Sequence, residues 1–288
     1  MGLQDVFFQT GIAFDSPEAI EMSTKISEEI YFWALSASCD LAVESGAHEG
    51  FAETRAAHGD LQFDLWGVTP SDTARWAALK DRISQHGLRN SLMIAIAPTA
   101  TIASIAGCYE CIEPQVSNLF KRETLSGEFL QINRYLVNEL QQRGLWDGDM
   151  AQKIKRAEGS IQEIAEIPED VREIYRTAWE LPQRALIDLA ANRGAYIDQS
   201  QSLNLFMESP SIGKLSSMYM HAWKSGLKTT YYLRSRPATR INQTTTGPMD
   251  DEPTGPPSDG SPAEASPFTD EEAIACSLEN PESCEACD

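Results

Sequence analysis

Residues 88–106 read LRNSLMIAIAPTATIASIA and carry the features on which the expected fold depends. Leu92–Ala97 is an almost unbroken apolar run of strand length, which is typical of a parallel strand covered on both faces. Pro98 then turns the chain, and the small residues Ala103–Ala106 favour the start of a helix. The stretch therefore predicts a buried strand that leads into a helix, as in an α/β fold.

The turn between this strand and this helix is rich in hydroxyl groups and consists of Pro98, Thr99, Ala100, Thr101 and Ile102. Free backbone N–H groups and the positive end of a helix dipole at such a turn suit a phosphate. The same pattern is typical of a simple capped helix, because threonine is a common N-cap and the turn lacks the glycine and lysine signature of a nucleotide loop. Spacing alone leaves both interpretations open.

Length and charge narrow the possible classes of protein. A chain of 288 residues is long enough for one large core or two modest ones. Its 43 acidic and 23 basic residues give a net charge of −20, so a nucleic acid polymer is not an expected partner. No apolar run reaches the length of a membrane span, and the N-terminus lacks the pattern of a signal peptide. We therefore expect a cytoplasmic protein without a membrane partner.

Helical patterns surround the opening stretch. Ser16 and Pro17 predict the start of a long helix that ends at Gly46, and a second helix is expected over 71–85. The predicted apolar face of the first helix consists of Met22, Ile26, Ile30, Ala34, Ala37 and Leu41. Further along, we expect helices over 127–142, 168–192 (bent at Pro182) and 211–225, with strands over 196–207 and 227–233. Strand, helix and strand at these lengths predict a right-handed parallel unit and hence an α/β architecture.

The cysteines are Cys39, Cys108, Cys111, Cys276, Cys284 and Cys287. In a chain of this size without a secretion signal, we expect reduced thiols with one or two functional pairs, not a disulfide framework. Cys39 lies in a helical pattern and is predicted to be a small core residue. Cys108 and Cys111 form a C-x-x-C that would suit a redox pair or half a metal site. Since no second pair lies nearby, we interpret them as structural and predict no metal site.

The composition changes abruptly after Arg240. Residues 241–288 contain 12 acidic residues and seven prolines but no lysine or arginine. Such a segment cannot bury enough apolar surface to offset its ordering entropy, so we predict a folded part, 1–240, and a flexible acidic tail, 241–288. The tail ends in Cys284 and Cys287, and a dithiol on a mobile arm suits a carrier of reducing equivalents. A structural zinc site usually needs four protein ligands, whereas the tail offers three cysteines and no histidine.

Several motifs resemble the large (alpha) subunit of class I ribonucleotide reductase. They are HGLRNS (86–91), the turn PTATI (98–102), IEP (112–114), LSGEF (125–129), DQSQSLN (198–204), GLKTTYY (226–232) and the terminal cysteine pair. They occur in the family's order over nearly the whole chain, which is similar to the C-terminal part of that ribonucleoside-diphosphate reductase subunit. The resemblance implies roughly the second half of a ten-stranded α/β barrel, followed by a disordered acidic tail.

The resemblance also implies roles for particular residues. The turn at 98–102 would bind the substrate phosphate, and Cys284 and Cys287 would shuttle reducing equivalents. Tyr231 and Tyr232 would relay an oxidising equivalent by coupled electron and proton transfer, with Tyr231 nearer the substrate cysteine and Tyr232 nearer the partner subunit. Adjacent side chains on a regular strand point to opposite faces. A relay therefore requires that the strand be distorted or end at this pair, so that the two rings lie close together.

The expected partners follow from the same resemblance. The chain would bind no cofactor itself, since a separate beta subunit supplies a tyrosyl or metal radical and thioredoxin or glutaredoxin supplies reducing equivalents. The family's thiyl-forming cysteine and its nucleotide-binding regulatory region precede the part that this chain resembles. We therefore expect an inactive isolated chain that needs the N-terminal half of the alpha subunit. The product of a split gene and a truncated sequence both fit.

A competing interpretation is a non-catalytic thiol carrier or metal-binding adaptor, whose globular part is only a scaffold. An adaptor requires neither close tyrosine rings nor affinity for phosphate, whereas a reductase requires both. The distance between the two tyrosine rings therefore discriminates between the two interpretations.

Overall fold

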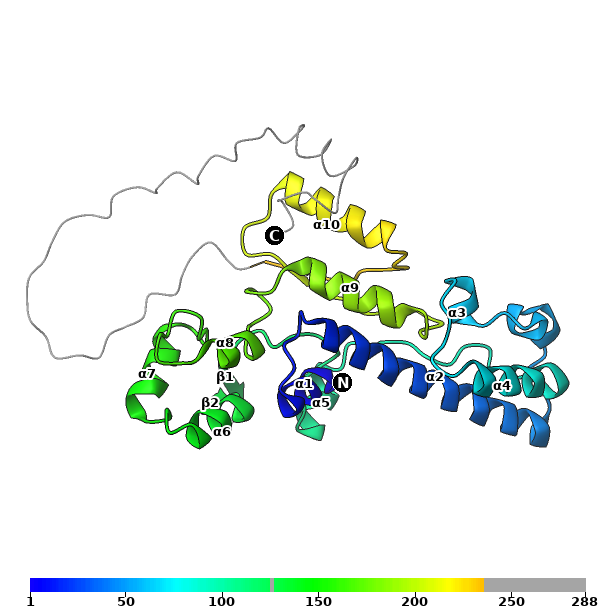
Figure 1. Cartoon of the computed structure of the whole chain (residues 1–288), viewed down its shortest axis with the longest axis horizontal. Helices are drawn as coiled ribbons and strands as arrows, with labels where there is room; N and C mark the ends of the chain where they lie inside the picture. Colours follow the sequence, from blue (N-terminus) through cyan, green and yellow to red (C-terminus); the bar gives the residue numbers. More distant parts are fainter. Residues whose placement is uncertain (125–126, 236–288) are drawn as a thin grey trace, which may run out of the picture.

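The computed structural model describes residues 1–124 and 127–235, in which helices dominate (Figure 1). The helices are α1 (Leu3–Thr10), α2 (Pro17–Ser45), α3 (Gln62–Leu65), α4 (Thr73–His86), α5 (Ala100–Ala106), α6 (Arg134–Gln142), α7 (Gly148–Arg156), α8 (Glu169–Ile174), α9 (Gln183–Gly194) and α10 (Ile212–Lys224), with short 3₁₀ turns at Phe51–Glu53 and Arg55–His58. The strands are β1 (Leu119–Thr124), β2 (Gly127–Ile132), β3 (Leu205–Phe206) and β4 (Leu233–Arg234). Within these residues, no helix combines the length and apolarity needed to cross a bilayer.

The ends of the first two predicted helices are confirmed by their capping interactions. Ser16 Oγ accepts a hydrogen bond of 3.1 Å from the backbone N–H of Ala19, and α2 ends at Gly46 as predicted. Helix α4 begins slightly later than predicted, because the side chain of Asp72 caps it. These boundaries depend on local interactions, which is why the sequence indicates them.

The predicted apolar face of α2 is confirmed in its first part, where Met22 and Ile26 pack partly buried against a hydrophobic core cluster, and is wrong from Ile30 onward. Ile30 and Leu41 are 52% and 47% exposed, whereas Tyr31, Leu35 and Cys39 are buried. The buried face is rotated there because aromatic rings fill the space between α2 and α4. Tyr31 packs against the indole of Trp76 on α4, with the ring centroids 6.0 Å apart. Cys39 is fully buried, so its assignment to the core is confirmed.

Trp76 on α4 provides a stability test of this contact. Its ring is 2% exposed, and its Nε1 donates a hydrogen bond of 2.9 Å to Glu28 Oε1, which is also buried. Trp76→Phe should lower the free energy of unfolding in urea by about 1–3 kcal/mol, because a buried carboxylate loses a donor and the smaller ring leaves space. Trp33→Phe is the control, since Trp33 is 62% exposed and donates to Glu29 at the surface. Its effect should stay within about 0.5 kcal/mol, and equal losses would contradict the prediction.

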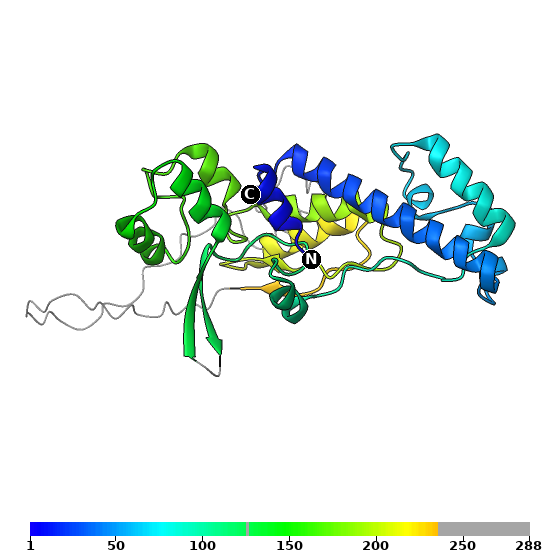
Figure 2. The same cartoon turned by 90° about the horizontal axis from the view of Figure 1, so that it is seen from below.

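Two predicted helices have the wrong bounds. Residues 127–132 form β2, which pairs antiparallel with β1 in a hairpin that projects away from the helices (Figure 2). The helix there is α6, and it begins only after Asn133, whose side chain caps it. The helix predicted over 168–192 is two helices, α8 and α9. Pro182 does not bend a helix but immediately precedes α9, where its missing N–H costs nothing.

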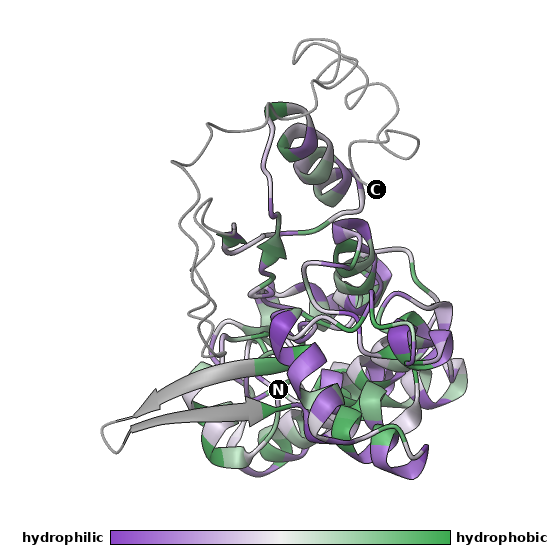
Figure 3. Cartoon of the chain, turned by 90° about the vertical axis from the view of Figure 1, so that its left-hand side faces the viewer, coloured by the Kyte–Doolittle hydropathy of each residue, from purple (hydrophilic) through white to green (hydrophobic). Residues whose placement is uncertain are grey.

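The predicted parallel arrangement of a strand, a helix and a strand is confirmed, because β3 and β4 pair in parallel and are joined through α10, and its right-handedness stays a prediction. The regular strands are shorter than predicted, and only Leu205 and Phe206 pair with Leu233 and Arg234. Helix α10, which joins the two strands, carries both hydrophobic and hydrophilic residues (Figure 3). Half of a ten-stranded barrel stays a prediction, and the tail 241–288 lies outside the described residues.

The run 92–97 is extended and bonds to the segment before β3. The N–H of Ile96 donates to the carbonyl of Ser200 (3.0 Å), and the N–H of Ser202 donates to the carbonyl of Ile96 (2.8 Å). The prediction that this run is covered on both faces is wrong, since Leu92 is 52% exposed and Ile96 is half-buried. Among the described residues, no strand pairs with the other edge of this run.

Candidate functional site

The two adjacent tyrosines lie close together just before β4. Tyr231 Oη donates a hydrogen bond of 3.3 Å to Tyr232 Oη, and the ring centroids are 4.1 Å apart with an interplanar angle of 52°. Both rings are about half exposed, and regular pairing begins only at Leu233. The predicted proximity of the rings is therefore confirmed. No strand ends at the pair as predicted; the tyrosines instead lie in an irregular segment, and the strand begins after them. The hydrogen bond to Tyr232 raises the pKa of Tyr231, because ionised Tyr231 could not donate it.

The backbone of the pair is fixed by the segment that leads into β3. The N–H of Tyr231 donates to the carbonyl of Leu203 (2.7 Å), and the carbonyl of Tyr232 accepts from the N–H of Leu205 (2.9 Å). The N–H of Tyr232 donates to Asn204 Oδ1 at 3.2 Å. Three consecutive residues of one segment thus hold both tyrosines, which explains how adjacent side chains can escape the alternation of a regular strand.

A buried carboxylate holds Asn204 in turn. Glu113 is 4% exposed; its Oε1 accepts from the N–H of Asn204, and its Oε2 accepts from Asn204 Nδ2, both at 2.9 Å. Burial raises the pKa of Glu113, and the two bonds from Asn204 oppose that effect. Sequence reasoning included both residues in its motifs but assigned no role to either.

Asp198 and Lys228 join the remaining motif segments. The Asp198 carboxylate accepts from the N–H groups of Met93 and Ile94 at 2.8 and 2.7 Å. Lys228 Nζ donates to three successive carbonyls, those of Ile197, Asp198 and Gln199, at 2.8–2.9 Å. These bonds attach both the extended run 92–97 and the segment that carries the tyrosines to residues 197–199. The pKa of Lys228 is lowered by burial.

The predicted phosphate turn forms the exposed N-terminus of α5. Thr99 precedes the helix, but its hydroxyl does not cap it and instead accepts from the N–H of Cys111 at 2.9 Å. Ala100, Thr101 and Ile102 form the first turn of α5 and are exposed. The N–H groups of a first helical turn have no acceptor within the helix. The turn therefore has the free donors that a phosphate would need.

The loop at 111–113 connects this turn with the tyrosine pair. At its start, Cys111 bonds to Thr99, and at its end, Glu113 bonds to Asn204, which contacts Tyr232. The structure thus links the two sites that were predicted separately. The sequence contained no signal for this link.

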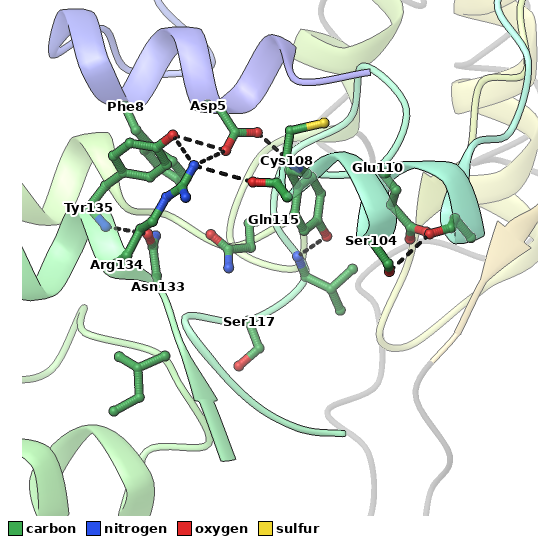
Figure 4. Close-up of a pocket in the computed structure, with 16 residues that line it drawn as sticks. Asp5, Phe8, Ser104, Cys108, Glu110, Gln115, Ser117, Asn133, Arg134 and Tyr135 are labelled. Carbon is green, nitrogen blue, oxygen red and sulfur yellow. Dashed lines mark hydrogen bonds and ion pairs between the residues drawn. The ribbon is translucent and has the colours of Figure 1, made fainter. Parts of the chain in front are cut away.

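A cavity of about 700 Å³ lies beside α5, between α1 and α6 (Figure 4). On one side, Asp5 accepts from the N–H of Tyr109 (2.6 Å) and from the hydroxyl of Tyr135 (3.1 Å). The Arg134 guanidinium lies 3.7 Å from Asp5. Cys108 also lines this cavity, so the two cysteines of the C-x-x-C differ in their surroundings, because Cys111 is buried.

The thiols in the described part of the chain are free. Burial raises the pKa of Cys111, which makes its thiol a poor nucleophile at neutral pH. Within residues 1–124 and 127–235, no three His, Cys, Asp or Glu side chains gather in a way that would hold a metal ion. Cys284 and Cys287 lie outside the described residues, so their shuttle role stays a prediction.

Parallel strands joined through a helix place the chain in the α/β class of folds. A family model described as the ribonucleotide reductase barrel domain matches residues 1–233, and the chain belongs to that family.

Similar proteins support this assignment. The chain is 46% identical over 99% of its length to the ribonucleoside-diphosphate reductase large subunit of Arabidopsis thaliana, and 50% identical over 86% to that of Dictyostelium discoideum. It spans 35% and 29% of those proteins, about a third of their length. A solved alpha subunit of the class Id ribonucleotide reductase of Actinobacillus ureae superposes with a TM-score of 0.63 and 26% identity, covering 83% of this chain and 38% of that one.

Proposed function

We propose that the chain forms part of the alpha subunit of a ribonucleoside-diphosphate reductase and takes part in the radical-based reduction of ribonucleotides to deoxyribonucleotides. The observation that carries the proposal is the 3.3 Å hydrogen bond between the hydroxyls of Tyr231 and Tyr232. A thiol carrier or adaptor would have no need for this contact. The names of the similar large subunits support the same reaction.

The tyrosine pair suits a relay of one electron and one proton. When Tyr232 has lost a hydrogen atom to the partner subunit, its oxygen takes one electron and one proton from Tyr231 Oη, which already donates a hydrogen bond to it. Tyr232 is then restored as a phenol, and Tyr231 becomes the phenoxyl radical. Tyr231 would next oxidise the thiyl-forming cysteine of the active site. That cysteine would lie in the N-terminal half of the alpha subunit.

The first turn of α5 would bind the diphosphate of the substrate. Its N–H groups and the positive end of the helix dipole favour an anion, and the residues of this turn are exposed. The chain itself would hold no cofactor. A separate beta subunit would provide the tyrosyl or metal radical.

The terminal dithiol would return reducing equivalents to the active site. Cys284 and Cys287 would reduce the disulfide that forms during turnover, becoming a disulfide themselves, and thioredoxin or glutaredoxin would then reduce them by thiol–disulfide exchange. The reaction balances, with two electrons and two protons passing from one dithiol to the next. The N-terminal half of the alpha subunit remains necessary, so the isolated chain would be inactive.

A reconstitution experiment tests this function. The chain would be mixed with a polypeptide that supplies the rest of the alpha subunit, a radical-generating subunit and a dithiol reductant. Formation of deoxyribonucleotide from a ribonucleoside diphosphate is the expected result. Absence of turnover, despite assembly and an active beta subunit, would contradict the proposal.

The phosphate-binding role leads to a prediction for Ala100. In the reconstituted enzyme, Ala100→Asp should raise the KM for the diphosphate about tenfold, because a carboxylate in the first turn competes with the phosphate for the helix N-terminus. Helix α5 itself should not be destabilised, since an acidic residue suits that position. Ala106→Asp, which adds the same charge at the other end of α5, should leave KM within about twofold. Equal effects of the two substitutions would argue against a phosphate at this turn.

A further inference from the structure

Glu113 takes no direct part in the proposed relay between Tyr231 and Tyr232. It is buried and spends both oxygens on Asn204, one on the backbone N–H and one on the side-chain amide, at 2.9 Å each. Asn204 is itself 2% exposed. A buried carboxylate needs such partners, because without them its desolvation would be costly. The pair is therefore fixed in one arrangement.

This arrangement determines where the remaining oxygen of Asn204 points. Because Glu113 accepts from Nδ2, the amide cannot rotate, and its Oδ1 accepts from the N–H of Tyr232 at 3.2 Å. The neighbouring backbone bonds of Leu203 and Leu205 hold the same segment. The orientation of the Tyr232 backbone thus depends on a carboxylate that is 91 residues away from Asn204 in the sequence.

A second buried charge lies in the surroundings of this carboxylate. Arg193 on α9 is 2% exposed, and its Nε donates to Gln201 Oε1 at 2.8 Å. Burial lowers the pKa of Arg193 to about 9, and the charge of Glu113 opposes that shift. The negative charge of Glu113 therefore favours the Arg193 cation without direct contact between the two side chains.

We propose that Glu113 is a positioning residue for the tyrosine pair, acting through Asn204 to set the contact between the hydroxyls of Tyr231 and Tyr232. Its importance for catalysis rests on the proposed relay, but the positioning itself is a property of this chain. The two ideas can therefore fail separately.

The test uses the whole 288-residue chain with isotope-labelled tyrosine and needs no turnover. In Glu113→Gln, the new amide group would face a donor of Asn204, so one bond would be lost and the asparagine would reorient. The amide proton of Tyr232 should then exchange with solvent about tenfold faster. The pKa of Tyr231, measured by NMR titration of its ring, should fall toward the value of an ordinary tyrosine, because the contact with Tyr232 loosens.

A reversed pair separates positioning from general damage. In the double variant Glu113→Gln with Asn204→Asp, the glutamine amide donates to the new carboxylate, whose other oxygen can again accept from Tyr232. Both readouts should return to their wild-type values even if Glu113→Gln alone is poorly folded. Glu110→Gln, immediately before the loop 111–113, is the control and should change neither readout. Unchanged readouts in Glu113→Gln, or no recovery in the reversed pair, would overturn the proposal.

Discussion

Replacing Tyr231 with phenylalanine should lower deoxyribonucleotide formation by the reconstituted enzyme roughly a thousandfold or more. Phenylalanine has no O–H group and cannot give a hydrogen atom to the oxidised Tyr232, so the relay would be interrupted between two groups that lie 3.3 Å apart. The turnover rate at saturating substrate is the quantity to measure. The fold should be preserved, since the ring of Tyr231 is 48% exposed and its backbone bonds do not depend on the hydroxyl.

A matched tyrosine substitution provides the control. Tyr219 on α10 is 41% exposed and lies outside the proposed relay, so Tyr219→Phe should retain most of the turnover. Binding of the diphosphate should be unchanged in Tyr231→Phe, because the proposed phosphate turn belongs to α5. If Tyr231→Phe retained more than about a tenth of the wild-type rate, the relay role of this tyrosine would have to be abandoned.

The ends of α2 were predictable from the sequence because their causes are local. Ser16 caps α2 through an atom three residues away, and Gly46 ends it. The direction of the buried face was not predictable in the same way. Helix α2 is apolar on several sides, with Tyr31 buried beside an exposed Ile30, so the choice of face depended on which rings of α4 pack against it.

Strand structure was harder to predict because it depends on a partner elsewhere in the chain. The apolar residues of 127–132 are Phe129, Leu130 and Ile132, a spacing that does not distinguish a helix from a strand, but the pairing of this segment with β1 makes it a strand. The run 92–97 has the composition of a fully covered strand, yet among the described residues it is bonded along one edge only. Composition indicated that this run was extended, but burial depends on what covers it.

The proximity of the two tyrosine rings could be predicted from the sequence, but its structural cause could not. Family resemblance indicated that Tyr231 and Tyr232 must be close, and the structure brings their rings together. It did not indicate how a chain achieves this. The answer lies in Glu113 and Asn204, which are 91 residues apart in the sequence and meet only after folding.

Gly159, between α7 and α8, should be intolerant of a side chain, and its substitution is the most severe test of the packing around the hairpin. Its φ is +88°, and a Cβ there would lie 2.0 Å from Ser117 Oγ and 2.7 Å from the backbone nitrogen of Leu119. Its carbonyl also accepts from the side chain of Asn118 at 3.1 Å. Gly159→Ala combines left-handed strain with a backbone collision, so the free energy of unfolding should fall by roughly 3–5 kcal/mol.

Gly144 separates the two causes because it has a similar backbone conformation in open space. Its φ is +70°, and no atom would lie within 4 Å of an added Cβ. Gly144→Ala should therefore cost only the left-handed strain, about 1–2 kcal/mol in urea unfolding. The difference between the two variants measures how rigidly residues 117–119, at the start of β1, are held against the turn after α7. Equal losses would mean that this segment moves aside easily, and the hairpin would then not be anchored at its base by Gly159.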